Sequence, residues 1–412
     1  MDQRLNPYTP NAGAEPEAVV GREDQLESFD VLLARLERGR TDQSMIVTGL
    51  RGVGKTVLLQ QFRQKAVENK WTVMDMEAEK SDTSSFRRDL GSRFHSALLQ
   101  LSPKARWSDR LSHAASVVKS FTLTGNPDGA ITFGLDIEAA EGYADHGNLT
   151  QDLVDLFVAV GEAAKDRGSG VVILLDEIQF LAKDQLGGII TALHKSVQYK
   201  YPITMVGAGL PQIAELAGDA KSYAERLFKF PRIGNLNASD AAEALSKPAL
   251  AEGIQFDQDA LDRAFQITEG YPYFIQELGY AVWAIADSEV ITLQNIEDAV
   301  PGYTDKLDQS FFQVRLDRCT ELQRAYLRAM ADLGPLPQRA NDVAERMGRT
   351  SQNQAPTRAE LISMGLLYTP EHGYAAYTVP QFDRYMMRAI PRLEVPEKRI
   401  RTPRHRASSD NE

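Results

Sequence analysis

Four short apolar segments rich in valine and isoleucine, separated by stretches with helical periodicity, constrain the fold of this chain more than any other feature. The segments are SMIVTG at 44–49, WTVMDME at 71–77, GVVILLDE at 170–177 and YPITMVGAG at 201–209. Short apolar strands that alternate with helices form a parallel sheet covered by helices on both faces. The sequence therefore predicts an α/β domain over residues 21–236, after an extended lead-in at 1–20.

A glycine-rich turn follows the first of these segments and runs directly into a helical pattern. The turn fits G-x-x-x-x-G-K-S/T, in which backbone N–H groups fold around phosphate oxygens at the start of a helix. Lys55 would reach the β- and γ-phosphates of ATP, and the hydroxyl of Thr56 would bind Mg²⁺. The residues predicted to surround the nucleotide here are Gly49, Leu50, Arg51, Gly52, Val53, Gly54, Lys55, Thr56 and Val57.

Two carboxylates end the third apolar segment, VVILLDE at 171–177. A parallel strand that ends in carboxylates opens onto the same crevice as a phosphate-binding loop. Asp176 would hold Mg²⁺ through water, and Glu177 would orient or deprotonate the attacking water. We therefore predict an ATPase in which Glu177 and Lys55 are catalytic.

The remaining segments differ from this alternating pattern. Two alternating stretches around the turn GNPDG predict a β-hairpin inserted at about 120–138. Residues 237–305 have a helical pattern only, whereas over 306–392 three amphipathic helices precede two strands, the order of a winged helix. Residues 393–412 are polar, charged and contain proline, so we expect them to be disordered.

The order of these motifs resembles that of an AAA+ ATPase, closest to the archaeal origin-recognition initiators and the related STAND ATPases. The resemblance covers about residues 17–392 and is carried by VGRED at 20–24, GLRGVGKT at 49–56, VVILLDE at 171–177, SYAERLF at 222–228 and EGYPYFIQ at 269–276. It implies a P-loop AAA+ parallel-sheet core, a helical lid at 237–305 and an α+β winged-helix domain. ATP with Mg²⁺ would lie between the core and the lid.

The resemblance also implies roles for four further residues. Gly21 and Arg22 would lie near the adenine and ribose, although they could equally begin a helix. Arg226 would reach a γ-phosphate, in its own chain or in a neighbouring subunit, or be a surface arginine. Pro272 would pack against the base, as in the G-x-P turn of STAND ATPases, or simply begin a helix.

Two departures from the AAA+ pattern concern turnover. Gly207, Ala208 and Gly209 end the fourth strand, where AAA+ proteins carry a polar side chain that contacts the γ-phosphate, and the lid lacks the usual sensor arginine. Fewer groups would then stabilise transition-state charge. We predict a slow, switch-like ATPase whose lid and winged helix move with the nucleotide state. The alternatives are a DNA-binding regulator or an oligomeric scaffold that holds nucleotide without significant turnover.

The second helix of the winged helix, at about 351–364, would be its recognition helix. Five polar side chains are expected to face outward and could hydrogen-bond base edges of duplex DNA. They are Gln352, Asn353, Gln354, Thr357 and Arg358. The region is not strongly basic, so a protein partner or a contact within the chain fits as well.

Composition narrows the remaining classes of function. A formal net charge of -11 argues against a protein that coats nucleic acid or membranes by bulk electrostatics. The single cysteine, Cys319, and the scattered histidines predict no structural metal. No apolar run approaches the ~18 residues that span a bilayer, and the first residues lack a secretory-signal pattern. We therefore expect a cytoplasmic protein with no membrane partner.

Overall fold

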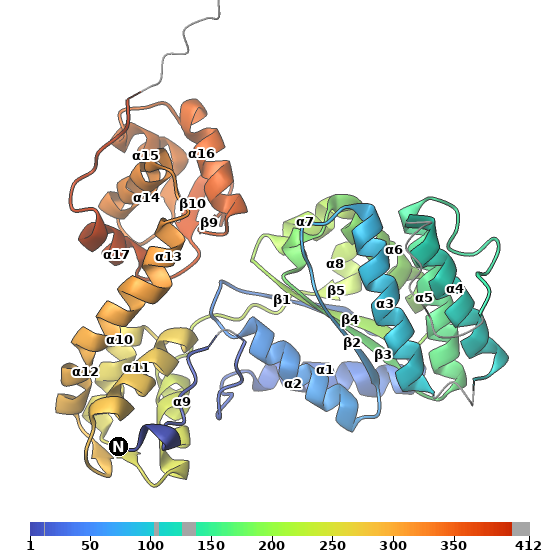
Figure 1. The fold of residues 1–412 in the computed structure, drawn as a ribbon, viewed down its shortest axis with the longest axis horizontal. Coiled ribbons are helices and arrows are strands. Elements are labelled where there is room, and N and C mark those ends of the chain that lie inside the picture. The colour runs from blue at the N-terminus through green and yellow to red at the C-terminus, as the bar shows by residue number, and fades with distance from the viewer. Residues whose placement is uncertain (12, 103–106, 126–136, 398–412) are drawn as a thin grey trace, which may run out of the picture. The chain divides into compact units, whose positions relative to one another are not determined.

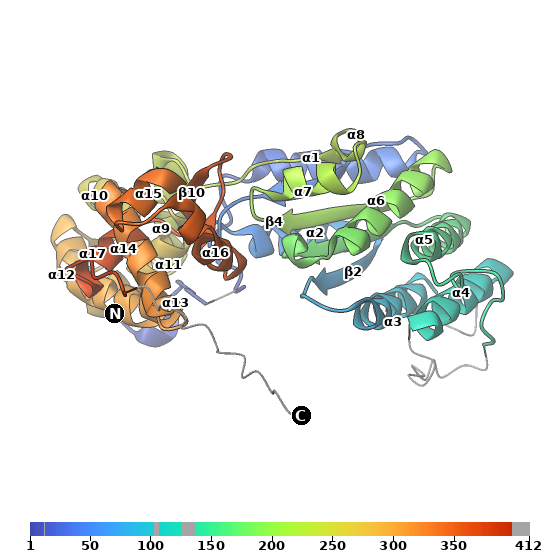
Figure 2. The ribbon, with the colours of Figure 1, turned by 90° about the horizontal axis from the view of Figure 1, so that it is seen from above.

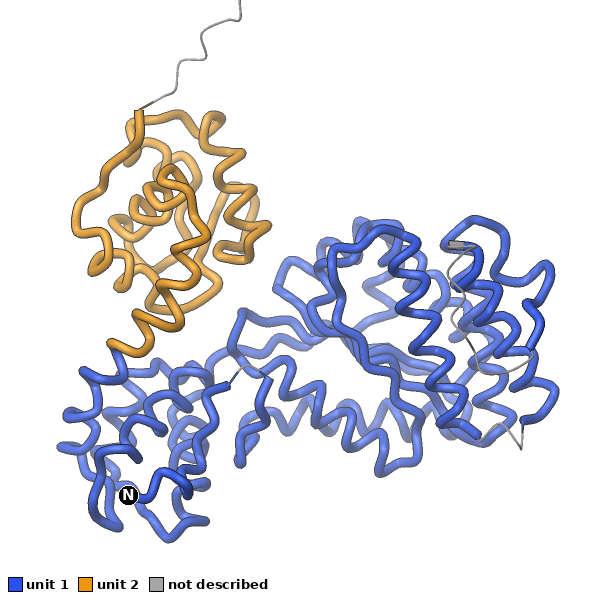
Figure 3. Tube along the Cα trace, in the orientation of Figure 1, with its two compact units in different colours: residues 1–304 blue, residues 305–412 orange. Residues whose placement is uncertain are grey.

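The structure is a computed structural model that describes residues 1–11, 13–102, 107–125 and 137–397. The chain divides into two compact units, residues 1–304 and 305–412 (Figure 3). No helix in the described part of the chain is long and apolar enough to cross a membrane.

A five-stranded parallel sheet forms the centre of the first unit (Figure 1). Its strands are β1 Ser44–Thr48, β2 Thr72–Glu77, β3 Val171–Asp176, β4 Ile203–Gly209 and β5 Phe228–Lys229. They lie in the order β2-β3-β4-β1-β5, so β4 lies between β1 and β3. The residues of β1 and β4 are buried throughout, which explains why these strands are continuously apolar rather than alternating. The predicted α/β core is confirmed.

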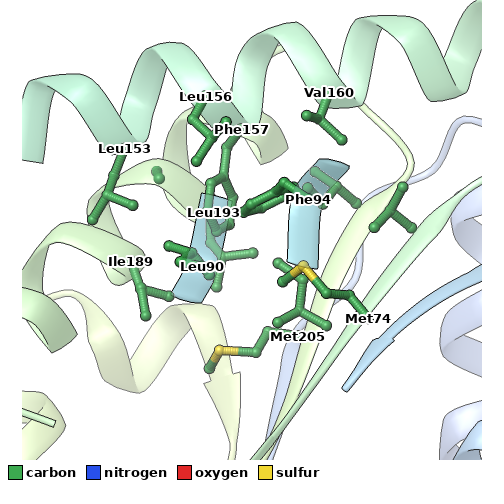
Figure 4. Packing of buried hydrophobic residues seen from close by; sticks show 14 of the residues in the cluster. Met74, Leu90, Phe94, Leu153, Leu156, Phe157, Val160, Ile189, Leu193 and Met205 are labelled. Carbon is green, nitrogen blue, oxygen red and sulfur yellow. The ribbon is translucent and has the colours of Figure 1, made fainter. Parts of the chain in front are cut away.

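Helices cover both faces of this sheet (Figure 1). On one face α2, Lys55–Glu68, packs against the strands with α1, Glu23–Glu37, beside it. The opposite face is covered by α3 Thr83–Leu101, α5 Leu149–Asp166 and α6 Lys183–Gln198. Figure 4 shows how the second face packs: Phe94 and Phe157 meet edge to face, above Met74 and Met205 of the strands.

One prediction for this unit is wrong, because residues 121–125 are not the first strand of an inserted hairpin. They form the end of α4, Asp109–Gly125, which packs beside α3 and α5 away from the sheet (Figure 2). Val117, Val118 and Phe121 are fully buried at helical spacing, and the Thr122 hydroxyl donates to the Val118 carbonyl at 2.8 Å. Helical packing therefore overrides the local alternation. The rest of the predicted hairpin, 126–136, lies outside the described residues.

The remaining elements of the first unit continue from β4. Short helices α7 Ile213–Ala220 and α8 Ala224–Leu227 lead into β5. A helical region follows, made of α9 Ala238–Ala251, α10 Gln258–Thr268, α11 Pro272–Ile285 and α12 Leu293–Lys306. Within it β6 Gln255–Phe256 pairs in parallel with β7 Val290–Ile291. We call this helical region the lid.

The second unit combines helices with a small antiparallel sheet. Its main helices are α14 Glu321–Leu333, α15 Ala340–Arg346, α16 Ser351–Ser363 and α17 Phe382–Ala389, after the short η4 Leu307–Phe312 and α13 Gln313–Leu316. The strands β8 Gln338–Arg339, β9 Leu367–Tyr368 and β10 Tyr374–Tyr377 lie in the order β8-β10-β9. Pro396 follows α17, and its carbonyl accepts a hydrogen bond from Arg349. Residues 398–412 fall outside the described residues.

Candidate nucleotide-binding site

The predicted phosphate loop lies between the last residue of β1, Thr48, and the first residue of α2, Lys55. Gly52 and Gly54 have φ angles of 73° and 93°, values that residues other than glycine rarely adopt. Gly54 directly precedes α2, whose first-turn N–H groups lack carbonyl partners within the helix. The loop therefore has the backbone form that binds an anion at a helix N-terminus.

Lys55 lies beneath this loop and is buried. Its ammonium group donates to the carbonyl oxygens of Gly49 and Leu50, at 3.0 and 2.8 Å. Burial lowers the pKa of Lys55, while the charges of Glu177 and Asp176 oppose this shift. A buried ammonium group that is incompletely compensated would gain from a bound anion. The loop thus fits a phosphate group in its charge as well as its shape.

The end of β3 brings the predicted magnesium ligands together. The hydroxyl of Thr56 donates to Oδ2 of Asp176 at 2.6 Å. Oδ1 of the same carboxylate accepts from the backbone N–H of Glu177 at 2.8 Å. Since β1 and β3 run parallel on either side of β4, their carboxyl ends reach the same edge of the sheet. Hydroxyl and carboxylate oxygens are the donors that Mg²⁺ prefers, so this pair fits the ion.

Arg22, predicted near the adenine and ribose, contacts the phosphate loop. One terminal nitrogen of its guanidinium donates to the carbonyls of Val53 and Gly234, at 3.0 and 2.8 Å. Burial lowers the pKa of Arg22, with the charges of Asp240 and Glu23 opposing the shift. Arg22 therefore ties the start of α1 to the loop and to the segment that enters the lid.

The preceding glycine, Gly21, lies against the lid. A Cβ at this position would come within 2.4 Å of a carboxylate oxygen of Asp240, and its φ is 66°. Glycine is therefore required where the VGRED segment meets α9.

Tyr271 is a site residue that sequence reasoning missed. Its hydroxyl donates to the carbonyl of Arg51, and a Cβ added to Gly52 would lie 2.2 Å from the tyrosine oxygen. Tyr271 is fully buried and is the N-cap of α11, whereas the predicted Pro272 is half-buried at the first position of that helix. An aromatic residue directly before a helix-starting proline was the only signal in the sequence.

The lead-in at 1–20 also makes contacts close to the phosphate loop, which the sequence did not reveal. Tyr8 is buried within the lid, where its hydroxyl donates to the Leu245 carbonyl at 2.6 Å. Further along, the Gly13 carbonyl accepts from the Gln60 side chain of α2 at 3.1 Å. A Cβ on Gly13 would lie 3.9 Å from the methyl group of Thr56. The lead-in thus connects the lid to α2 beside the predicted magnesium ligands.

Arg226 does not reach the phosphate loop of its own chain. It is exposed on α8, immediately before β5. Phe228 of β5 pairs in parallel with Ser44, the first residue of β1, whereas the loop follows the last residue of β1. α8 therefore lies at the opposite end of the sheet. The role toward a neighbouring subunit and that of a surface arginine both remain predictions.

The polar residues of α16 do not all face outward, which corrects the prediction for the second unit. Gln354 and Thr357 are buried, with exposed fractions of 2% and 6%. They share a helix face with the fully buried Leu361. Gln352 and Asn353 are exposed and Arg358 is half-buried, so three of the five remain accessible.

Comparison with known proteins identifies parts of both units. Residues 18–206 match the family described as AAA ATPase domain, and residues 309–386 match a domain of unknown function (DUF8462). No curated protein matches the chain.

Several solved structures are similar to this chain. A Walker-type ATPase of Pyrococcus abyssi has a TM-score of 0.57 and 13% identity, over 90% of this chain and 97% of that chain. The Orc1 protein of Aeropyrum pernix, solved in complex with DNA, has a TM-score of 0.46 and 15% identity, over 94% and 96% of the two chains. Cdc6p of Pyrobaculum aerophilum has a TM-score of 0.45 and 14% identity, over 95% and 98%. At 13% identity the similarity to the Pyrococcus abyssi ATPase concerns the fold alone.

Proposed function

We propose that this chain, which carries an AAA ATPase domain at residues 18–206, is a switch operated by Mg-ATP. In this proposal the nucleotide binds between the core and the lid and is hydrolysed slowly. The nucleotide state then changes the position of the lid and of the C-terminal unit.

The residues around the phosphate loop support the binding part of the proposal. Lys55 and the N–H groups at the start of α2 would hold the phosphates, and Thr56 and Asp176 would hold Mg²⁺. When bound, Mg-ATP supplies the γ-phosphoryl group and the cation that neutralises its charge. Glu177 would orient the attacking water and accept its proton.

The contact of Tyr271 with the phosphate loop is the main observation in support of the proposed switch. Its hydroxyl donates to the Arg51 carbonyl, and its ring occupies the space beside Gly52. A change in the loop that moves Arg51 or Gly52 must therefore change the position of Tyr271, at the start of α11. Slow turnover is supported by the end of β4, where Gly207, Ala208 and Gly209 offer no polar side chain.

Steady-state ATP turnover of the purified chain, compared with that of Glu177→Gln, tests this function. We expect turnover that depends on Mg²⁺ and falls by at least ~100-fold in the variant. Glu68→Gln is the matched control, because Glu68 is exposed and ends α2, at the other end of that helix from Lys55. Equal rates in the wild type and Glu177→Gln, with ATP still bound, would favour the regulator or scaffold. Absence of binding at millimolar Mg-ATP would refute the proposal entirely.

The same assay with duplex DNA tests whether the second unit senses nucleic acid. We propose a winged helix there, in which Gln352, Asn353 and Arg358 of α16 contact DNA. DNA should then raise the turnover, and Asn353→Ala should weaken the effect. No effect of DNA would direct the search to protein partners.

The position of Arg226 extends the proposal to an oligomer of this chain. We assign it to the γ-phosphate of a neighbouring copy, because it cannot reach the loop of its own chain. ATP should then promote assembly, measured as molecular mass, and Arg226→Ala should lower turnover without weakening ATP binding. A monomer at all ATP concentrations would contradict this role.

A further inference from the structure

The turn between β3 and α6 packs directly on the end of β4. This turn is a 3₁₀ helix, Ile178–Phe180, that begins after Glu177. A Cβ added to Gly207 would come within 3.0 Å of Ile178, and a Cβ added to Gly209 within 2.7 Å of Oε1 of Gln179. The glycines that leave β4 without a polar side chain thus make room for a polar side chain from the turn.

The amide of Gln179 bridges the end of β4 to Glu177. Its Oε1 accepts from the backbone N–H of Leu210, the residue after β4, at 3.1 Å. Its Nε2 donates to Oε2 of Glu177. Because a backbone N–H can only donate, the Leu210 contact determines which end of the amide faces Glu177. The side chain of Gln179 therefore presents a donor, not an acceptor, to the carboxylate.

We propose that Gln179 is the positioning residue for Glu177, and this inference rests on the proposed ATPase function. The bridge holds one oxygen of the carboxylate in place. Oε1 of Glu177, which has no donor among the described residues, is left to accept a proton from water. Gln179 thus compensates for the missing polar side chain on β4, acting through Glu177.

Glu177 needs such support because its backbone is unusual. Its φ and ψ are 49° and 37°, in the left-handed region that is unfavourable for a residue with a side chain. Its backbone N–H is held by Asp176, but the carboxylate lies at the end of a flexible side chain. A displacement of about 1 Å at a reacting group can cost on the order of 100-fold in rate.

Turnover and ATP binding of three single variants test the inference. Gln179→Ala should lower kcat roughly 10- to 100-fold while KM and the Kd for ATP stay within about twofold. Gln179→Glu should be at least as slow, because it keeps the acceptor for Leu210 but opposes Glu177 with a like charge and no donor. Gly209→Ala should also lower kcat, because its methyl group would displace the Gln179 amide from the end of β4.

Gln185 provides the matched control in the neighbouring helix. Its amide makes a similar bridge, accepting from the Ala182 N–H at 3.0 Å and donating to the Ser81 carbonyl at 3.2 Å, without contacting Glu177. Gln185→Ala should lower the stability of the first unit but leave kcat unchanged. An equal loss of kcat in both glutamine variants would reduce Gln179 to a structural role and overturn the inference.

The double variant Gln179→Ala with Glu177→Gln separates this inference from the proposed function. If Gln179 acts through Glu177, the double variant should be no slower than Glu177→Gln alone. If Glu177→Gln is slow while Gln179→Ala matches the wild type or exceeds it, the inference fails and the ATPase function stands. If Glu177→Gln has no effect, the proposed hydrolysis itself fails.

Discussion

Replacing Gly52 by alanine should loosen the lid from the phosphate loop. The φ of 73° at this position costs alanine about 1 to 2 kcal/mol relative to glycine. The new methyl group would also lie 2.2 Å from the hydroxyl oxygen and 2.7 Å from Cζ of Tyr271. That ring is fully buried and packs on Phe274 at a centroid distance of 4.6 Å, so it cannot move aside while keeping its contacts.

Displacing Tyr271 should cost its hydrogen bond to Arg51, about 1 kcal/mol, and the contact with Phe274, about 1 kcal/mol. Together with the backbone strain, we expect Gly52→Ala to lower the free energy of unfolding by about 3 to 4 kcal/mol. Gly54→Ala is the matched control, because φ there is 93° but nothing lies within 4 Å of an added Cβ. It should lose only about 1 to 2 kcal/mol.

Urea unfolding in the absence of nucleotide, followed by tryptophan fluorescence, measures this difference. The tryptophans all belong to the first unit: Trp71, Trp107 and Trp283. In a Tyr271→Leu background the excess cost of Gly52→Ala over Gly54→Ala should disappear. Equal costs of the two alanine variants in the wild-type background would refute the contact between the lid and the loop.

Three further predictions follow from single contacts. Asp152→Asn removes the charge that faces the buried guanidinium of Arg87 at 2.5 Å, and should lower the free energy of unfolding by about 3 to 5 kcal/mol in the same fluorescence assay. Arg22→Ala should raise the Kd for ATP about 10-fold in equilibrium binding, because the guanidinium that holds the Val53 carbonyl is lost, and unchanged affinity would contradict this. Burial raises the pKa of Cys319 to about 11, so its thiolate fraction at pH 8 is about 100-fold below that of a thiol with the ordinary pKa of 9.0. A thiol reagent at pH 8 should therefore modify Cys319 slowly in the folded protein and rapidly in urea, and equal rates would show that the thiol is accessible.

The parallel sheet and the phosphate loop could be predicted from the sequence because their signals are local. Apolar segments such as SMIVT and VVILLD are short and rich in β-branched residues, and two of the loop glycines, Gly52 and Gly54, stand at positions whose φ is positive. The approach of Asp176 to Thr56 followed from the rule that parallel strands end at one edge of a sheet.

Residues 121–125 illustrate why local pattern fails elsewhere. Phe121 and Leu123 alternate with threonines, which is equally compatible with a strand and with the last turn of a helix. Packing of α4 against α3 and α5 decides for the helix, and this packing depends on residues far from the turn. The burial of Gln354 and Thr357 has the same cause, since a polar residue gives no sign of which helix face will meet the core.

The sequence by itself determined the class of fold, the phosphate loop and the carboxylates beside it, because each depends on residues within one strand, turn or helix. Only the tertiary structure decided which groups support that site. Tyr271 and Arg51 are 220 residues apart, and Gln179 and Leu210 are 31 apart. Such contacts arise when separate elements pack together, and neither composition nor periodicity specifies which side chains then meet.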